Sequence, residues 1–157
     1  LRRPENRLMN IRPATTADTA SLADLSGQLG YPVLAESLQL SLARLLSSAG
    51  QIVYVAEEPG EGVLGWIHGA EQELLESGRR CEILGLVVDQ GARRRGVGRR
   101  LVEAVERWAA RRDLGEVSVR SAVSRAESHP FYERLGYDAI KTQHVYRKRL
   151  SPGAAAE

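Results

Sequence analysis

Five arginines and two glycines lie close together in the stretch Arg93-Arg94-Arg95-Gly96-Val97-Gly98-Arg99-Arg100. An apolar, strand-like run precedes the stretch, and an amphipathic, helix-like run follows it. The first turn of a helix has unpaired N–H groups and partial positive charge, and glycines there let a ligand approach the backbone closely. Arginines add charge-assisted donors. The stretch therefore predicts a cradle for an anion, and most naturally for a diphosphate.

The spacing of these glycines excludes two common phosphate-binding motifs. A dinucleotide fold needs Gly-x-Gly-x-x-Gly, but the position three residues after Gly98 is Leu101. A P-loop needs Gly-Lys-Ser/Thr, which the stretch lacks. What remains is Arg-x-x-Gly-x-Gly between a strand and a helix. The residues alone leave one plainer interpretation open, namely a loop with two turn glycines and a solvated basic patch.

Length and composition indicate one α/β domain with a single core. The chain has 157 residues and a net charge of only +2, which says little about partners. The single cysteine, Cys81, excludes an intrachain disulfide and a cysteine-based metal site, and the three histidines show no ligand spacing. We therefore expect no bound metal. No apolar run approaches the roughly 18 residues that a membrane helix needs, so no membrane association is expected.

Hydrophobic periodicity predicts alternating helices and strands around a largely antiparallel sheet. The domain is expected over 9–150, after an extension (1–8) that is disordered or not native, and before a flexible tail (151–157). We predict strands at 10–13, 52–56, 63–70, 82–88, 116–121, 137–142 and 144–148, helices at 16–29, 34–46, 98–112 and 125–135, and a polar loop with a helical turn at 71–80.

Two segments resemble the GCN5-related N-acetyltransferase (GNAT) superfamily, and in particular its small, single-domain bacterial members. One is Leu-Val-Val-Asp at 86–89, followed by four residues and then Arg-x-x-Gly-x-Gly. The other is Phe-Tyr-x-x-x-Gly-Tyr at 131–137. The resemblance covers about residues 10 to 150. It implies a mixed, mostly antiparallel sheet of six to seven strands, with about four flanking helices and splayed central parallel strands.

The resemblance further implies acetyl-CoA as co-substrate and assigns its binding positions. The pantetheine arm would pair with the strand edge at Leu86, Val87 and Val88. Arg94 stands where the family often has glycine, so a positive φ would strain it. The pyrophosphate would lie on backbone amides of the loop, and Arg125 stands where many members contact the cofactor with asparagine. The loop positions are Arg93, Arg94, Arg95, Gly96, Val97, Gly98 and Arg99.

The resemblance to the family also assigns catalytic roles to residues of this chain. Tyr132 stands where many members place a tyrosine near the thioester sulfur, and its phenol would protonate the leaving thiolate. Because an amine is almost wholly protonated at neutral pH, a base must remove its proton. Glu82, at the start of the central strand, is the candidate base. Glu73 and His68 are alternative bases. Cys81 could in principle carry the acyl group as a nucleophile, although the family usually transfers the group directly.

The activity that the resemblance implies is direct acetyl transfer from acetyl-CoA to a primary amine in a ternary complex. The acceptor is open among a small molecule, an antibiotic and a protein N-terminus or lysine, with a mild preference for a small-molecule amine. A rival hypothesis is an acetyl-CoA sensor without turnover. Nucleic-acid binding is not expected, because no aromatic residues interleave with the arginines. A cytoplasmic location and a homodimer complete the expectation.

Overall fold

The computed structural model describes residues 9–153. The chain divides into two compact units, Leu1–Arg120 and Ser121–Glu157, which are described separately below. The extension predicted at 1–8 and the last four residues of the predicted tail lie outside the described residues. Within residues 9–153, no helix combines the length and the apolar character needed to cross a bilayer.

The first unit is built on a five-stranded sheet with the order β1-β2-β3-β4-β5. All neighbours pair antiparallel except β4 and β5, which pair parallel. This confirms the predicted α/β class, with one to two strands fewer than expected. The strands are β1 (Asn10–Pro13), β2 (Gln51–Glu58), β3 (Gly62–Leu74), β4 (Gly78–Val88) and β5 (Val117–Val119).

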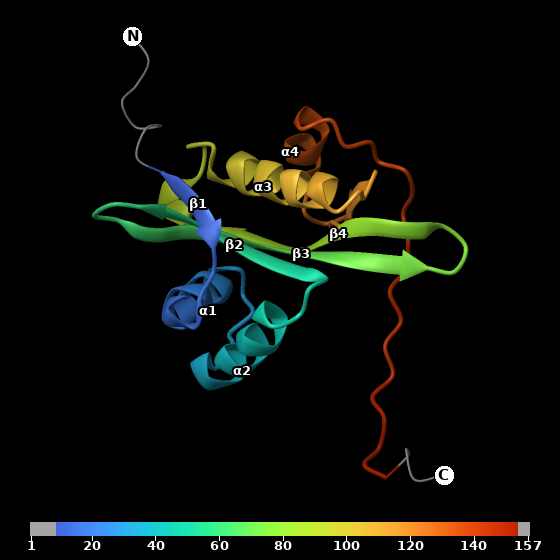
Figure 1. Cartoon of the computed structure of the whole chain (residues 1–157), viewed down its shortest axis with the longest axis horizontal. Coiled ribbons are helices and arrows are strands. Elements are labelled where there is room, and N and C mark those ends of the chain that lie inside the picture. The colour runs from blue at the N-terminus through green and yellow to red at the C-terminus, as the bar shows by residue number, and fades with distance from the viewer. Residues whose placement is uncertain (1–8, 154–157) are drawn as a thin grey trace. The chain divides into compact units, whose positions relative to one another are not determined.

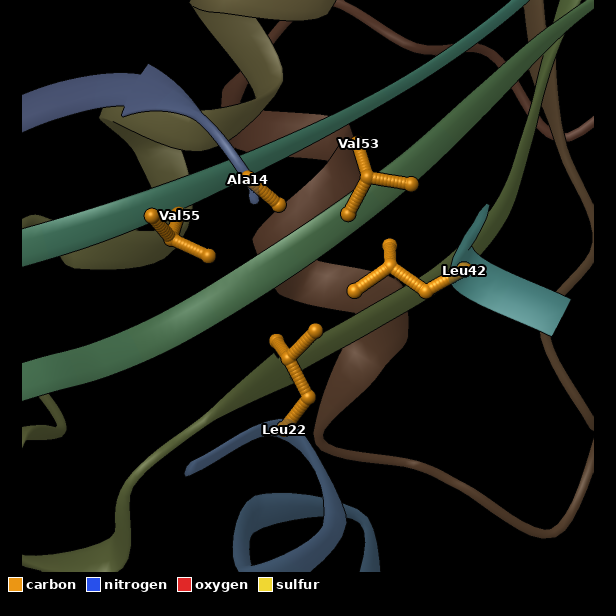
Figure 2. Packing of buried hydrophobic residues seen from close by; sticks show 5 residues of the cluster. All are labelled: Ala14, Leu22, Leu42, Val53 and Val55. Atoms are coloured by element: carbon orange, nitrogen blue, oxygen red, sulfur yellow. The ribbon is translucent and has the colours of Figure 1, made fainter. Parts of the chain in front are cut away.

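Helices cover both faces of this sheet. Helices α1 (Thr19–Gln28) and α2 (Ala35–Leu46) lie on one face, and α3 (Val97–Arg111) lies on the other (Figure 1). On the α1/α2 face, apolar side chains from both helices meet those of β2 (Figure 2). The residues of this cluster are Ala14, Leu22, Leu42, Val53 and Val55.

Helix α3 packs unusually close to the sheet because two glycines of β3 face it. A Cβ built on Gly69 would lie 2.9 Å from a methyl carbon of Val105, and one on Gly65 would lie 3.2 Å from a methyl carbon of Leu101. Both contacts are tighter than normal packing allows. The close approach fixes the height of α3, and therefore of its N-terminus, over the end of β4.

The prediction of a polar loop with a helical turn at 71–80 is wrong. The structure has instead a long hairpin in which β3 and β4 stay paired as far as Leu74 and Gly78. The polar side chains that suggested a loop stabilise this extension. Glu71 binds Arg79 on the neighbouring strand at 2.5 Å and Arg112 at 2.6 Å.

The second unit contains α4 (Ser128–Arg134), which Gly136 follows with a φ of 91°. The ring of Tyr132 lies edge-on to Phe131 and Tyr137, with centroids 5.0 and 5.9 Å away. The predictions of strands at 137–142 and 144–148 are wrong, since residues 138–150 form no strand. Their sequence alternates as a strand does, but a strand exists only when a partner backbone accepts its hydrogen bonds.

Candidate active site

The junction between β4 and α3 leaves several backbone amides without a partner inside the helix. A short 3-10 turn (Gln90–Ala92) follows β4, and the chain then enters α3 through Gly96, which has a φ of 80°. The first helical hydrogen bond of α3 runs from the amide of Arg100 to the carbonyl of Gly96. The amides of Val97, Gly98 and Arg99 therefore have no partner within the helix. A Cβ on Gly96 would meet no heavy atom within 4 Å, so the space beside this turn is open.

The five arginines of this stretch divide into two sets. Arg93, Arg94 and Arg99 are exposed beside the turn, and Arg99 also forms a long ion pair with Glu103 of α3 at 3.8 Å. Arg95 donates to both Glu58 and Glu61 of the β2–β3 turn, the latter at 2.9 Å. Arg100 donates to the carbonyl of Met9 at 2.7 Å. The second set fixes the loop to the rest of the unit.

The pKa values of the two carboxylates shift in opposite directions. A hydrogen bond with Arg95 lowers the pKa of Glu61 below its ordinary range. A hydrogen bond with Glu61 raises the pKa of Glu58. In this structure Arg95, which the sequence analysis placed among the cofactor-binding residues, is engaged by carboxylates instead of facing solvent.

A glutamine from α1 anchors the other end of the loop. The amide nitrogen of Gln28 donates to Asp89 at 2.8 Å, and its oxygen accepts from the backbone of Gln90 at 3.0 Å. Asp89 also accepts from the backbone of Gly91 at 2.9 Å. The sequence offered no signal for the role of Gln28, because its partners lie more than 60 residues away.

Arg94 has a φ of 66°, in the left-handed region that favours glycine. The sequence left the backbone angles at this position open, and the structure shows the strained case. Holding a non-glycine residue there costs about 1 to 2 kcal/mol. Its neighbour Arg93 has a φ of −63° and an extended backbone, which any residue adopts easily.

Arg94→Gly is therefore expected to raise the free energy of unfolding by about 0.5 to 1 kcal/mol, the relief of strain less the added chain entropy of glycine. Arg93→Gly is the matched control, because it removes the same charge from a relaxed position. It should lower the free energy of unfolding by about 0.5 to 1 kcal/mol. Urea unfolding of both variants measures the difference, and equal destabilisation would contradict the strain.

The edge of β4 that faces β5 is open beyond its first few residues. Parallel pairing covers only Cys81 to Ile83, whereas β4 continues to Val88. The amide of Asp89 donates to Leu64 on the β3 side. Because successive amides of a strand point to opposite edges, Val87 also points toward β3, and Leu86 and Val88 point toward the open edge. Val88 and Leu86 are thus the free donors along this edge.

Glu82 lies where β4 and β5 are still paired, opposite Ser118. Glu82 is almost fully buried, with 3% of its surface exposed. One carboxylate oxygen binds the guanidinium of Arg120 at 3.1 Å, and the other is buried without a hydrogen-bond partner among the described residues. Leaving a buried acceptor unsatisfied costs about 1 to 3 kcal/mol, so such an atom calls for an explanation beyond stability.

The alternative catalytic groups are less suitable. Nε2 of His68 lies 2.6 Å from the side-chain oxygen of Gln51, and burial lowers the histidine's pKa. Glu73 is exposed in the extended hairpin. Cys81 is fully buried, and burial raises its pKa to about 11, so almost no thiolate is present at neutral pH.

Residues 9–153 contain no group of three or more side chains placed to bind a metal ion.

Trp66 on β3 partly covers β4. A Cβ on Gly85 would lie 2.8 Å from the indole ring, so only glycine fits beneath it. The indole also packs against the apolar cluster on the α1/α2 face, and its N–H is buried without a partner among the described residues. The sequence carries no signal for this pairing, because nothing local links Trp66 to Gly85.

Tyr132 and Arg125 belong to the second unit, and the other predicted site residues belong to the first. Burial raises the pKa of Tyr132 above its ordinary value of about 10, and the charge of Arg125 opposes that shift. The phenol is therefore protonated at neutral pH, as a proton donor must be. Arg125 itself is exposed.

Comparisons with known proteins agree with the sequence resemblance. A profile described as the Acetyltransferase (GNAT) family matches residues 20–137. Aminoglycoside N(6')-acetyltransferase type 1 of Klebsiella aerogenes is 27% identical over 146 residues, which span 89% of this chain and 96% of that protein.

Solved structures with the same fold include two aminoglycoside acetyltransferases. One is the 6'-N-acetyltransferase AAC(6')-Ih from Acinetobacter baumannii, with a TM-score of 0.80, 20% identity, and coverage of 91% of this chain and 99% of that chain. The other is AAC(6')-Iy in complex with CoA, with a TM-score of 0.82 and 20% identity. The match covers 90% of this chain and 95% of that chain. At this identity they establish the fold.

Proposed function

Because the chain belongs to the acetyltransferase (GNAT) family, we propose that this acetyl-CoA-dependent N-acetyltransferase acetylates a primary amine on a small molecule, by direct attack in a ternary complex. The observation that supports this most is the glycine turn at the N-terminus of α3. Its unpaired amides, open space and exposed arginines fit the diphosphate of CoA.

In this proposal the amides of Val97, Gly98 and Arg99 would hold the diphosphate, and Arg93 and Arg94 would add positive charge. The open edge of β4 accepts the pantetheine arm as an added strand, through the backbone of Leu86 and Val88. Acetyl-CoA supplies an activated acetyl thioester when it is bound. Arg95 and Gln28 act before binding, since they hold the loop in the conformation that presents these amides.

Three groups of the chain would assist the transfer. The amide of Leu86, the free donor of β4 that lies nearer to Glu82, donates a hydrogen bond to the thioester carbonyl and stabilises the charge that develops on its oxygen. The unpartnered oxygen of Glu82 takes the proton of the attacking amine, directly or through water. The phenol of Tyr132 protonates the leaving thiolate. Holding the amine and the thioester in line provides the rest of the rate enhancement.

For the acceptor, we propose an aminoglycoside carrying a 6'-amine as the first compound to test. The name of the 27% identical relative supports this choice. A buried carboxylate at Glu82 also suits a cationic amine before it loses its proton. A simpler metabolite-like amine and a protein amine remain the alternatives, and the predicted homodimer and cytoplasmic location stay part of this proposal.

The experiment follows release of free CoA thiol from acetyl-CoA in the presence of an aminoglycoside with a 6'-amine. The matched control is the analogue with a 6'-hydroxyl group, which keeps the scaffold and removes the acceptor nitrogen. We expect thiol release with the amine alone. Acetyl-CoA binding without thiol release for any amine in a broad library would favour the sensor hypothesis instead.

Tyr132→Phe is expected to lower kcat on the order of tenfold while leaving the Kd for acetyl-CoA unchanged. The effect is moderate because a thiolate, with a thiol pKa near 8.5, is a fair leaving group that water also protonates. Tyr137→Phe is the matched control, since Tyr137 packs against the same ring. A kcat equal to that of the wild type would remove Tyr132 from the chemistry.

A further inference from the structure

We propose that Glu58 and Glu61, called here the acidic pair, are positioning residues that raise the affinity for acetyl-CoA by fixing the glycine turn through Arg95. The inference rests on the function proposed above, because it takes the glycine turn as the site of the diphosphate. It goes beyond that function in giving a role in binding to two carboxylates whose charge opposes that of the ligand. They act through Arg95 and not by touching acetyl-CoA.

The acidic pair is carried on the tight turn between β2 and β3. Glu58 is the last residue of β2 and pairs with Gly62 of β3. The backbone amide of Glu61 donates to the carbonyl of Glu58 at 3.0 Å and closes the turn. The two carboxylates are therefore attached to a backbone that the sheet already fixes.

One guanidinium nitrogen of Arg95 binds both members of the acidic pair. Nη2 donates to Glu58 and, at 2.9 Å, to Glu61. The two carboxylates lie close enough to shift each other's pKa, so the guanidinium between them offsets their repulsion. Glu58 is also buried. Moving Arg95 away would leave two like charges together, one of them buried, without their common partner.

The backbone on both sides of Arg95 is what this contact holds in place. Arg95 stands between Arg94 and Gly96, which have φ values of 66° and 80°. A non-glycine residue stays in the left-handed region only where its surroundings enforce it, and glycine has many other conformations open to it. The contact with the acidic pair therefore favours the one conformation of the turn that leads into α3 with its first amides unpaired.

The acidic pair has two effects on acetyl-CoA binding, and they have opposite signs. Negative charge near an anionic diphosphate weakens binding, so removing the charge alone would lower the Kd. A turn that adopts its binding conformation only part of the time binds more weakly, in proportion to that fraction. We expect the second effect to dominate, because Arg95 already neutralises part of the charge of the pair. The sign of the change in Kd decides between them.

The test is the double variant Glu58→Gln/Glu61→Gln, measured by titration calorimetry with acetyl-CoA. We expect the Kd to rise about tenfold, as for a turn that adopts the binding conformation about a tenth of the time. The KM for acetyl-CoA should rise with it. The kcat at saturating acetyl-CoA should stay at the wild-type value, because bound cofactor restores the turn. A role in stability alone would lower the free energy of unfolding and leave the Kd unchanged.

Glu57→Gln is the matched control, since it removes the same charge from the neighbouring position. The Glu57 carboxylate binds Arg12 of β1 at 2.7 Å, so the Kd should stay at the wild-type value or slightly below it. Arg95→Gln should raise the Kd by the same factor as the double variant. The triple variant should raise it no further, because all of these changes remove one contact.

Glu61→Gln alone changes the more exposed carboxylate of the pair, so it preserves the fold and should raise the Kd by a smaller factor. An unchanged or lower Kd in the single and double variants, or additive effects in the triple variant, would overturn this inference and leave the glycine turn as the proposed cofactor site. A wild-type protein that does not bind acetyl-CoA would overturn the proposed function, and this inference with it. The wild-type titration thus separates the two failures.

Discussion

Gly96→Val is expected to weaken acetyl-CoA binding at least 100-fold. Two effects act together. The left-handed φ of 80° is costly for a β-branched residue, so the turn that presents the amides of α3 shifts. The new methyl groups also project into the space that is open beside Gly96, where the proposal places the diphosphate. Titration calorimetry with acetyl-CoA measures the change in Kd.

The control for this variant is Gly78→Val. Gly78 has a φ of 77° and equally open surroundings, but it lies in the turn of the β3–β4 hairpin. The backbone strain is therefore matched, and only the location differs. Gly78→Val should lose similar stability and keep the wild-type Kd. If both variants bind acetyl-CoA as the wild type does, the glycine turn is not the cofactor site.

Glu82→Gln is expected to lower kcat/KM for the amine on the order of 100-fold, at the low end of what general base catalysis contributes. Glutamine keeps the shape of the side chain and one acceptor oxygen for Arg120, so the fold and the Kd for acetyl-CoA should persist. The activity that remains should rise with pH as more of the free amine becomes available.

Glu73→Gln is the matched control for that substitution. It makes the same change of charge at an exposed carboxylate on β3. Wild-type kcat/KM in Glu73→Gln and a loss in Glu82→Gln would locate the base at Glu82. An unchanged kcat/KM in Glu82→Gln would show that another group or solvent removes the proton.

Local sequence features predicted the glycine turn well, because its signals are local. Gly96 at the helix N-cap, the buried strand before it and the amphipathic α3 after it are properties of one continuous stretch. The position of Arg94, where related sequences often have glycine, raised the question of a positive φ but did not decide it, and the structure shows a φ of 66°. Each of these features depends on residues that are close together in the chain, so the sequence alone can predict it.

The features that were missed depend on partners far along the chain. The role of Arg95 follows from Glu58 and Glu61, and that of Gln28 follows from Asp89 and Gln90. The polar hairpin extension at 71–80 was mistaken for a loop because its stabilising ion pairs join separate elements. Residues 138–150 alternate as a strand does, but they form no strand, because a sequence pattern does not supply a partner backbone.

An NMR titration with CoA tests the cofactor site most directly. The amide proton–nitrogen spectrum of the protein reports each backbone N–H separately, without relying on turnover or on any variant. We predict that the largest shifts fall on Val97, Gly98 and Arg99 at the start of α3, and on Val88 at the open edge of β4. Saturable binding with shifts centred on other amides, and none at these four, would contradict the proposed site.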